Sequence, residues 1–233
     1  NQAPIAKPDD FGARPDNTTI LAVLDNDIDP DGDVLTVSSL SDVSPSEGAV
    51  VTIDGGRALQ FVPAPGASSA SFRYTVTDGR PGGVAEAQVT ISIRPVDPEL
   101  DLPPAPTRPS LVSLEAGQDV TYNVLTDWID PDGDDLLLTS AESTSGDVVR
   151  FRPDGLVTFT HVSAELGQKS VTLTVSDGIK QFGGAFIVDV KAPGDLRPVG
   201  VPDFTGAFVA EPFEVSPLAN DRSPSGQPLT LVS

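Results

Sequence analysis

The stretch LDNDIDPDGDVLTV, Leu24–Val37, returns twice along the chain. It reads LTDWIDPDGDDLLL at Leu125–Leu138 and LANDRSPSGQPLTL at Leu218–Leu231. A second anchor also repeats, because YTVTDG at Tyr74–Gly79 matches LTVSDG at Leu173–Gly178. Self-similarity at a period of roughly 100 residues is the signature of an array of like domains. Such an array usually serves as a spacer or a binding surface and not as a single catalytic pocket.

The 233 residues hold two whole repeats and the start of a third. We place the repeats at residues 1–95, 96–191 and 192–233, and a unit of this size can bury its own core. The segment Arg94–Pro109 joins the first two repeats and is rich in proline. Proline restricts its own backbone and that of the residue before it, so this linker is expected to be extended and semi-rigid.

Apolar and polar residues alternate with a period of two, as in Phe72, Tyr74 and Val76. Such alternation marks strands with one buried face. In the first repeat it predicts strands near 5–9, 18–24, 34–39, 48–53, 57–62, 70–77 and 84–93. In the second it predicts strands near 110–115, 118–124, 135–141, 146–151, 155–160, 169–176 and 183–190. The predicted fold is all-β, with tandem immunoglobulin-like or cadherin-like β-sandwich domains of about seven strands joined by proline-rich linkers. No helix is expected beyond one turn at 162–167.

The formal net charge is −20, and the three repeats contribute −7, −10 and −3. Because every repeat is acidic, we expect neither nucleic acid nor anionic lipid as a partner. The chain has no cysteine, so disulfides do not hold the domains. No apolar run approaches the ~20 residues that cross a bilayer, and no signal peptide is present. We interpret the sequence as a fragment of a longer protein, with no membrane insertion within it.

Acidic residues crowd the repeated stretch around Pro30 and Gly32. Neighbouring carboxylates repel one another unless they are solvated, protonated or shared around a cation. Ca²⁺ takes roughly six to eight oxygen ligands and accepts flexible Asp-rich loops. The stretch is not an EF-hand, because Ser38 stands at the twelfth position and strands flank the loop. The alternative interpretation is a tight Asx-type turn between two strands.

The expected topology adds further acids to this hypothesis. In an immunoglobulin-like sandwich the Asp-rich loop and the Asp177-Gly178 turn should both face the preceding linker. Calcium could then lock the first junction, whereas the second, with fewer acids, should respond weakly. The candidate metal ligands are Asp25, Asp27, Asp29, Asp31, Asp33, Asp97, Glu99, Asp101, Asp127, Asp130, Asp132, Asp134 and Asp177.

Two single residues were weighed as functional candidates. His161 is the only histidine, and a lone histidine at the end of a predicted strand favours a structural role. Trp128 is the only tryptophan. It is either a binding anchor, since aromatic residues dominate interface hot spots, or a residue that packs against its own linker. No catalytic residue is assigned, and the chain is predicted not to be an enzyme.

The motifs at Asn1–Asp10, Asn26–Leu35 and Tyr74–Gly79 together resemble the tandem cadherin-like or Ig-like repeats of large bacterial surface proteins. The resemblance implies extracellular display, adhesion or spacing, often with Ca²⁺ at domain junctions. True cadherins carry an Asp-x-Asn-Asp-Asn linker that this chain lacks, which implies one ion at a junction and not three.

The prediction is therefore a structural stalk or adhesin segment, at a bacterial cell surface or secreted. Its partners would be neighbouring repeats, and a protein or glycan on another surface. The alternatives are a glycan- or protein-binding module and the accessory repeats of a secreted enzyme.

Overall fold

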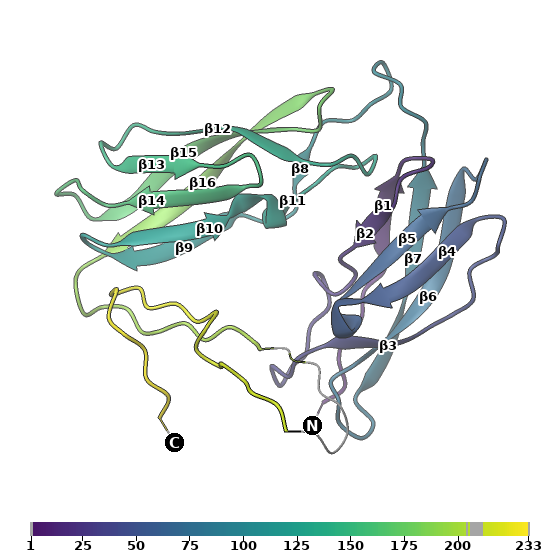
Figure 1. The fold of residues 1–233 in the computed structure, drawn as a ribbon, viewed down its shortest axis with the longest axis horizontal. Coiled ribbons are helices and arrows are strands. Elements are labelled where there is room, and N and C mark those ends of the chain that lie inside the picture. Colours follow the sequence, from purple (N-terminus) through teal and green to yellow (C-terminus); the bar gives the residue numbers. More distant parts are fainter. Residues whose placement is uncertain (1, 204, 206–211, 233) are drawn as a thin grey trace. The chain divides into compact units, whose positions relative to one another are not determined.

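The computed structural model describes residues 2–203, 205 and 212–232 (Figure 1). The chain forms two compact units. The first comprises Asn1–Asp101 together with Pro131–Asp134, and the second comprises Leu102–Asp130 and Asp135–Ser233. Strands make up almost all the regular structure of the described residues, which confirms the predicted all-β class.

The first unit is a sandwich of two sheets with the same number of strands as predicted for one repeat. The four-stranded sheet has the order β1 (Asp9–Ala13), β7 (Val84–Ile93), β6 (Ser69–Thr77), β3 (Thr36–Leu40). The three-stranded sheet has the order β2 (Thr19–Leu21), β5 (Ala58–Pro63), β4 (Gly48–Ile53). Strand β1 runs parallel to β7, and the other neighbours are antiparallel.

The second unit repeats this order. Its four-stranded sheet is β12 (Leu137–Ser143), β15 (Gly167–Ser176), β16 (Gln181–Lys191), β9 (Ser110–Glu115). Its three-stranded sheet is β10 (Asp119–Asn123), β14 (Leu156–Thr160), β13 (Val148–Phe151). A short pair, β8 (Ala105–Pro106) and β11 (Trp128–Ile129), joins the linker to the acidic stretch.

Each sandwich has its own core. In the first, the inward residues of β6 and β7 pack against Leu59 and Phe61 of β5. In the second, Phe159 and Phe186 take the centre, and the ring of Phe186 stacks on Tyr122 with centroids 5.6 Å apart. The alternation that predicted these strands is thus the alternation of buried and exposed side chains.

Three local predictions were wrong. The first strand was expected at 5–9 but spans Asp9–Ala13, because it pairs in parallel with β7 and buries Asp9, which breaks the apolar pattern. The short strands β8 and β11 were missed, since two residues carry no periodic signal. The helical turn expected at 162–167 is absent from these described residues, and the 3₁₀ turns are Asp54–Gly56 (η1) and Val124–Asp127 (η2).

Candidate functional site

The first acidic loop, residues 25–33, contains an Asx-type turn. Oδ1 of Asp29 accepts hydrogen bonds from the backbone N–H of Asp31 at 2.9 Å and of Asp33 at 3.0 Å. Gly32 has φ of +78°, a left-handed conformation that glycine adopts without strain. The turn that the sequence left open as an alternative is therefore present, and it uses one oxygen of Asp29.

Two carboxylates of this loop bond to groups outside it. Arg80 donates to both oxygens of Asp33, from Nε at 2.5 Å and from Nη2 at 2.8 Å. The backbone and side-chain amides of Gln2 donate to Asp31 at 2.6 and 3.3 Å. These contacts hold the pKa of both carboxyls below the usual range. Both groups thus stay ionised at neutral pH.

Asp27 bonds to the sandwich itself. Its Oδ2 accepts from the hydroxyl of Tyr74 at 2.9 Å, and its Oδ1 accepts from the backbone N–H of Lys7 at 2.8 Å. Burial raises the pKa of Asp27, and these two hydrogen bonds oppose that rise. The sequence placed Asp27 with its loop neighbours, but its two oxygens anchor the N-terminal segment and the buried Tyr74.

Asp9 is a buried acid that sequence reasoning missed. It is 7% exposed, and its Oδ1 accepts from Nδ2 of Asn26 at 2.9 Å. Burial raises the pKa of Asp9 to about 7; the hydroxyl of Tyr74 opposes the shift and the charge of Asp27 adds to it. A carboxyl at this position is therefore costly to ionise and shares its surroundings with Asp27.

The part of the chain after residue 191, called the third segment below, has the same hydrogen bonds at its described residues. This repetition is the signal in the sequence that could have identified Asp9. The N–H of Val201 donates to Oδ1 of Asp221 at 2.8 Å, as Lys7 does to Asp27. Nδ2 of Asn220 donates to the carbonyl of Pro202 at 3.1 Å, as Asn26 does to Pro8. Pro-Asp at 202–203 thus repeats Pro-Asp at 8–9, and Asn-Asp at 220–221 repeats Asn-Asp at 26–27.

The second repeat has a different set of residues at these positions. Asp127 replaces Asn26, is fully buried, and accepts from Nε of Arg108 at 2.5 Å and from the hydroxyl of Tyr122 at 3.1 Å. Trp128 replaces Asp27. Arg108 therefore neutralises this carboxylate, and both hydrogen bonds go to its Oδ1.

Trp128 is 8% exposed and packs within its own repeat. Its strand pairs with Pro106 of the linker, and its ring lies edge-on to Phe182 with centroids 6.1 Å apart. A cavity of about 360 Å³ lies beside it, lined by the linker and by Gly184. Of the two roles considered for Trp128, the structure shows packing against the linker.

Within the first unit, Arg14 contacts three of the predicted metal ligands. Arg14 follows Ala13, the last residue of β1, and its side chain is 2% exposed. Nη2 lies 2.5 Å from Oδ1 of Asp101 and 3.8 Å from Oδ2 of Asp132. Nε and Nη2 both donate to Asp134, with Nε at 2.9 Å from each carboxylate oxygen. The pKa of Arg14 is raised, chiefly by the hydrogen bond to Asp134, so the guanidinium stays charged despite its burial.

Backbone packing and a second arginine complete this cluster. Arg94 donates from Nη1 to Oδ1 of Asp132 at 2.8 Å. A Cβ on Gly12 would lie 2.1 Å from the carbonyl oxygen of Pro131, so the loop 131–134 rests directly on the backbone of β1. We call Arg14, Arg94, Asp101, Asp132 and Asp134 the Arg14 cluster.

Two of the remaining predicted acids cap local turns. Asp97 accepts from the N–H of Glu99 at 3.0 Å, and Asp177 accepts from the N–H groups of Ile179 and Lys180, both at 2.6 Å. Asp25 is exposed and Asp130 is buried. The structure thus brings Asp101, Asp132 and Asp134 together and leaves Asp97, Glu99 and Asp177 in turns of their own.

The predicted calcium ligands already differ in the bonds that their carboxylates make. Across residues 2–203, 205 and 212–232, no group of three or more Asp, Glu, His or Cys side chains is placed to hold a metal ion. Arginine guanidinium groups, and not a shared void, lie between the acids of the Arg14 cluster. Calcium binding by the predicted ligands stays a prediction.

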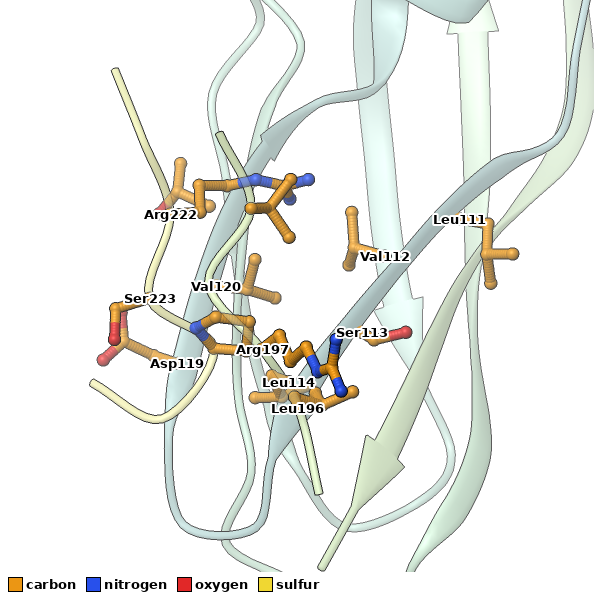
Figure 2. Close-up of a pocket in the computed structure, with 13 residues that line it drawn as sticks. Leu111, Val112, Ser113, Leu114, Asp119, Val120, Leu196, Arg197, Arg222 and Ser223 are labelled. Carbon is orange, nitrogen blue, oxygen red and sulfur yellow. The ribbon is translucent and has the colours of Figure 1, made fainter. Parts of the chain in front are cut away.

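The second unit also contains a pocket of about 490 Å³ (Figure 2). Strands β9 and β10 line it on one side and the third segment lines it on the other. Figure 2 shows Arg197 and Arg222 on the third segment, with Val112, Leu114 and Val120 on the strands. The pocket thus combines an apolar wall with two arginines and one acid, Asp119, in a strongly acidic chain.

His161 has a structural role. It is 5% exposed; its Nδ1 accepts from the N–H of Gly117 at 3.0 Å, and its Nε2 lies 3.1 Å from the carbonyl of Glu165. This pattern needs the neutral tautomer that carries its proton on Nε2.

None of the described helices has the length and apolar character of a membrane span.

Comparison with solved structures finds many chains with resembling folds. An endo-fucoidan hydrolase of glycoside hydrolase family 107 is 20% identical with a TM-score of 0.33, covering 82% of this chain and 29% of its own. The Ig1-2 module of the Drosophila receptor protein tyrosine phosphatase DLAR is 17% identical with a TM-score of 0.30, covering 82% and 100%. The N-terminal four Ig domains of Dscam1 isoform 4.44 are 11% identical with a TM-score of 0.36, covering 82% and 54%.

This chain thus spans less than a third of the hydrolase, as the 29% coverage shows. Identities this low and TM-scores this small support no statement about activity. No curated protein matches the chain in sequence.

The match to a family model identifies the family of this chain. The model of the bacterial Ig domain matches residues 1–92 and again residues 101–187, which are most of the chain. Domains of this family are non-catalytic. The two matches agree with two sandwiches of one strand order. The chain belongs to the bacterial Ig domain family, of which it carries two tandem copies.

Proposed function

We propose that the chain is a non-enzymatic spacer: a stalk or adhesin segment of a secreted or surface-displayed bacterial protein. The array of Ig domains supports the proposal, because each sandwich buries its own core and adds length. The proline-rich linker also supports the spacer function, because proline restricts the backbone conformations of the linker.

The observation that most supports a spacer is the Arg14 cluster. Asp101 lies within the linker and Asp132 and Asp134 lie in the next acidic loop, yet all three contact Arg14. Neither Asp101 nor Asp132 exposes its side chain. A buried, multiply bonded arginine orders the segments that it joins, and a spacer transmits extension only through ordered segments.

Small-angle scattering of the whole chain tests this function. We expect the wild type to scatter as a particle with limited bending, and Arg14→Ala to scatter as a more flexible one. Arg57→Ala is the matched control, because Arg57 pairs with Asp54 on the surface. A wild type as flexible as Arg14→Ala would contradict the spacer function.

Calcium is proposed as an additional stiffening ligand, as the resemblance to surface repeats implies. The contacts favour the first-repeat loop, because three arginines already pair with three of the predicted ligands in the second repeat: Asp134, Asp132 and Asp127. Calorimetric titration with Ca²⁺, with Mg²⁺ as control, should show binding that Asp29→Asn weakens. Identical heats with and without the substitution would exclude this loop as the site.

The pocket of Figure 2 supports a second function, the binding of an anionic glycan or acidic peptide. Two arginines recognise carboxylates well because guanidinium groups bond to both oxygens at once. Oligogalacturonate is a suitable probe. Binding that is lost in Arg197→Ala and Arg222→Ala would favour this function over a simple spacer, and no binding to the wild type would exclude it for this probe.

A further inference from the structure

Arg14 and Glu115 occupy the same position in the two repeats. In the first, Ala13 pairs with Ile93 at the end of β7, and Arg14 follows. In the second, Leu114 pairs with Val190 at the end of β16, and Glu115 follows. Both side chains are buried, at 2% and 5% exposure. One position of the fold therefore holds a buried cation in one repeat and a buried anion in the next.

Each of these residues meets the same two segments further along the chain. Arg14 contacts the linker through Asp101, and the loop after it rests on the backbone of β1 through Pro131. Glu115 accepts from the N–H of Leu196 in the second linker at 3.2 Å. Its own N–H donates to the carbonyl of Pro224 at 3.0 Å, and Pro224 is the counterpart of Pro131. The first set of contacts lies within the first unit and the second set within the second unit.

The loops differ in charge as their receiving residues do. The loop that meets Arg14 reads Pro-Asp-Gly-Asp at 131–134, and the loop that meets Glu115 reads Pro-Ser-Gly-Gln at 224–227. The two aspartates of the first of these loops are thus replaced by Ser225 and Gln227 in the loop that meets Glu115. An uncompensated pair of like charges that is removed from water costs several kcal/mol, so acids beside Glu115 would oppose docking.

We propose that this position and the Pro-x-Gly-x loop form a charge-matched pairing rule that decides which bacterial Ig repeat follows which. An arginine at the position accepts an acidic loop, and a glutamate accepts a neutral one. The loop of the first repeat, Pro-Asp-Gly-Asp at 30–33, is acidic, so its matching partner is a repeat that carries arginine at the position of Arg14. The inference rests on the proposed spacer function, because it names what each junction recognises.

Hydrogen exchange of the full chain tests the rule at the first junction. Arg14→Glu should speed the exchange of the Leu100 and Asp101 amides at least about 10-fold, because it removes a buried ion pair and adds a like charge. Adding Asp101→Asn, Asp132→Ser and Asp134→Gln to that variant removes the facing acids and should restore most of the protection. The amide of Val89 in β7 reports whether the sandwich itself stays folded.

The reciprocal change at the second junction keeps the test decisive if Arg14→Glu unfolds the first sandwich. Glu115→Arg should speed exchange at Leu196, and adding Ser225→Asp and Gln227→Asp should restore it. Failure of the matched changes to restore protection at both junctions would overturn the pairing rule. It would leave the spacer function intact, since scattering of the wild type tests that separately.

Discussion

Arg14 and Asp134 lie 120 residues apart in the chain, and the guanidinium of the first donates to the carboxylate of the second from both Nε and Nη2. The same arginine reaches Asp101 and the carbonyl of Pro95. It therefore binds the start of the linker, the middle of the linker and the following acidic loop. A single side chain converts an acidic, self-repelling stretch into an ordered one.

Replacement of Arg14 should therefore destabilise the first unit strongly. Arg14→Met keeps the apolar stem but leaves Asp101 buried without the Arg14 cation, whereas Asp132 keeps its ion pair with Arg94. We expect a loss of roughly 3 kcal/mol in the free energy of unfolding of that unit, measured by denaturant titration. Arg57→Met, at an exposed ion pair, should change little. Equal effects of the two substitutions would refute the importance assigned to burial.

The glycine pair of β16 provides a sharper test of packing. A Cβ at Gly184 would lie 2.4 Å from Cζ2 of the Trp128 ring, whereas at Gly183 its nearest neighbour would be the Leu173 carbonyl oxygen at 3.9 Å. Gly184→Ala should destabilise the second unit by about 2 kcal/mol and shift the fluorescence of its single tryptophan. Gly183→Ala should do neither. A Gly184→Ala variant that behaves like Gly183→Ala would show that Trp128 does not pack there.

The two tyrosine hydroxyls should differ in their contribution to stability. Tyr74→Phe leaves the buried carbonyl of Val23 and Oδ2 of Asp27 without a hydroxyl donor, so we expect a cost of about 1–2 kcal/mol. Tyr122→Phe should cost less, because Asp127 keeps Arg108. Thermal unfolding of the two variants measures the difference, and a larger loss for Tyr122→Phe would contradict it.

Asp147 should make the second unit sensitive to strong acid. Burial alone would raise the pKa of this carboxyl, but hydrogen bonds from the Ser145 hydroxyl and the N–H groups of Ser163 and Val162 outweigh it and lower the pKa to about 2. Because the folded pKa lies below the unfolded value, the stabilisation is present above roughly pH 4 and is lost as the pH falls through about 2.

Asp147→Asn should accordingly lower stability at neutral pH and flatten its fall between pH 4 and pH 2. Asp154→Asn is the matched control, since Asp154 is half exposed, pairs with the exposed Arg152 and accepts a long backbone hydrogen bond from Leu156 at 3.5 Å. Stability measured by denaturant titration at several pH values gives the comparison. An unchanged acid profile in Asp147→Asn would show that other groups set it.

The sequence predicted the strands well where apolar alternation was strict. Strands β4 and β7 match their predicted ranges, and β15 and β16 differ by at most two residues at each end. It failed at β1, because a strand that pairs in parallel at a sheet edge and buries an aspartate has no alternation to read. It also missed β8 and β11, whose pairing depends on a linker residue meeting a loop residue.

The candidate site was only half visible in the sequence. The acids stand next to one another in the chain, so their crowding could be read directly. Their arginine partners do not: Arg80 is 47 residues from Asp33, and Arg94 is 38 residues from Asp132. Such pairs are created by the fold alone. Alignment of Arg14 with Glu115 likewise needed the strand registers, because the residues around them share no motif.

The most direct measurement of the spacer is the distribution of distances between the two repeats. The chain has no cysteine, so Gln88→Cys and Thr172→Cys, both at exposed strand positions, introduce a unique pair of spin-label sites. Pulsed electron–electron double resonance should give one narrow distribution of label-to-label distances in the wild-type background and a broad one when Arg14→Ala is added. A distribution that is equally broad in both would contradict the claim that the Arg14 cluster orders the junction of a spacer.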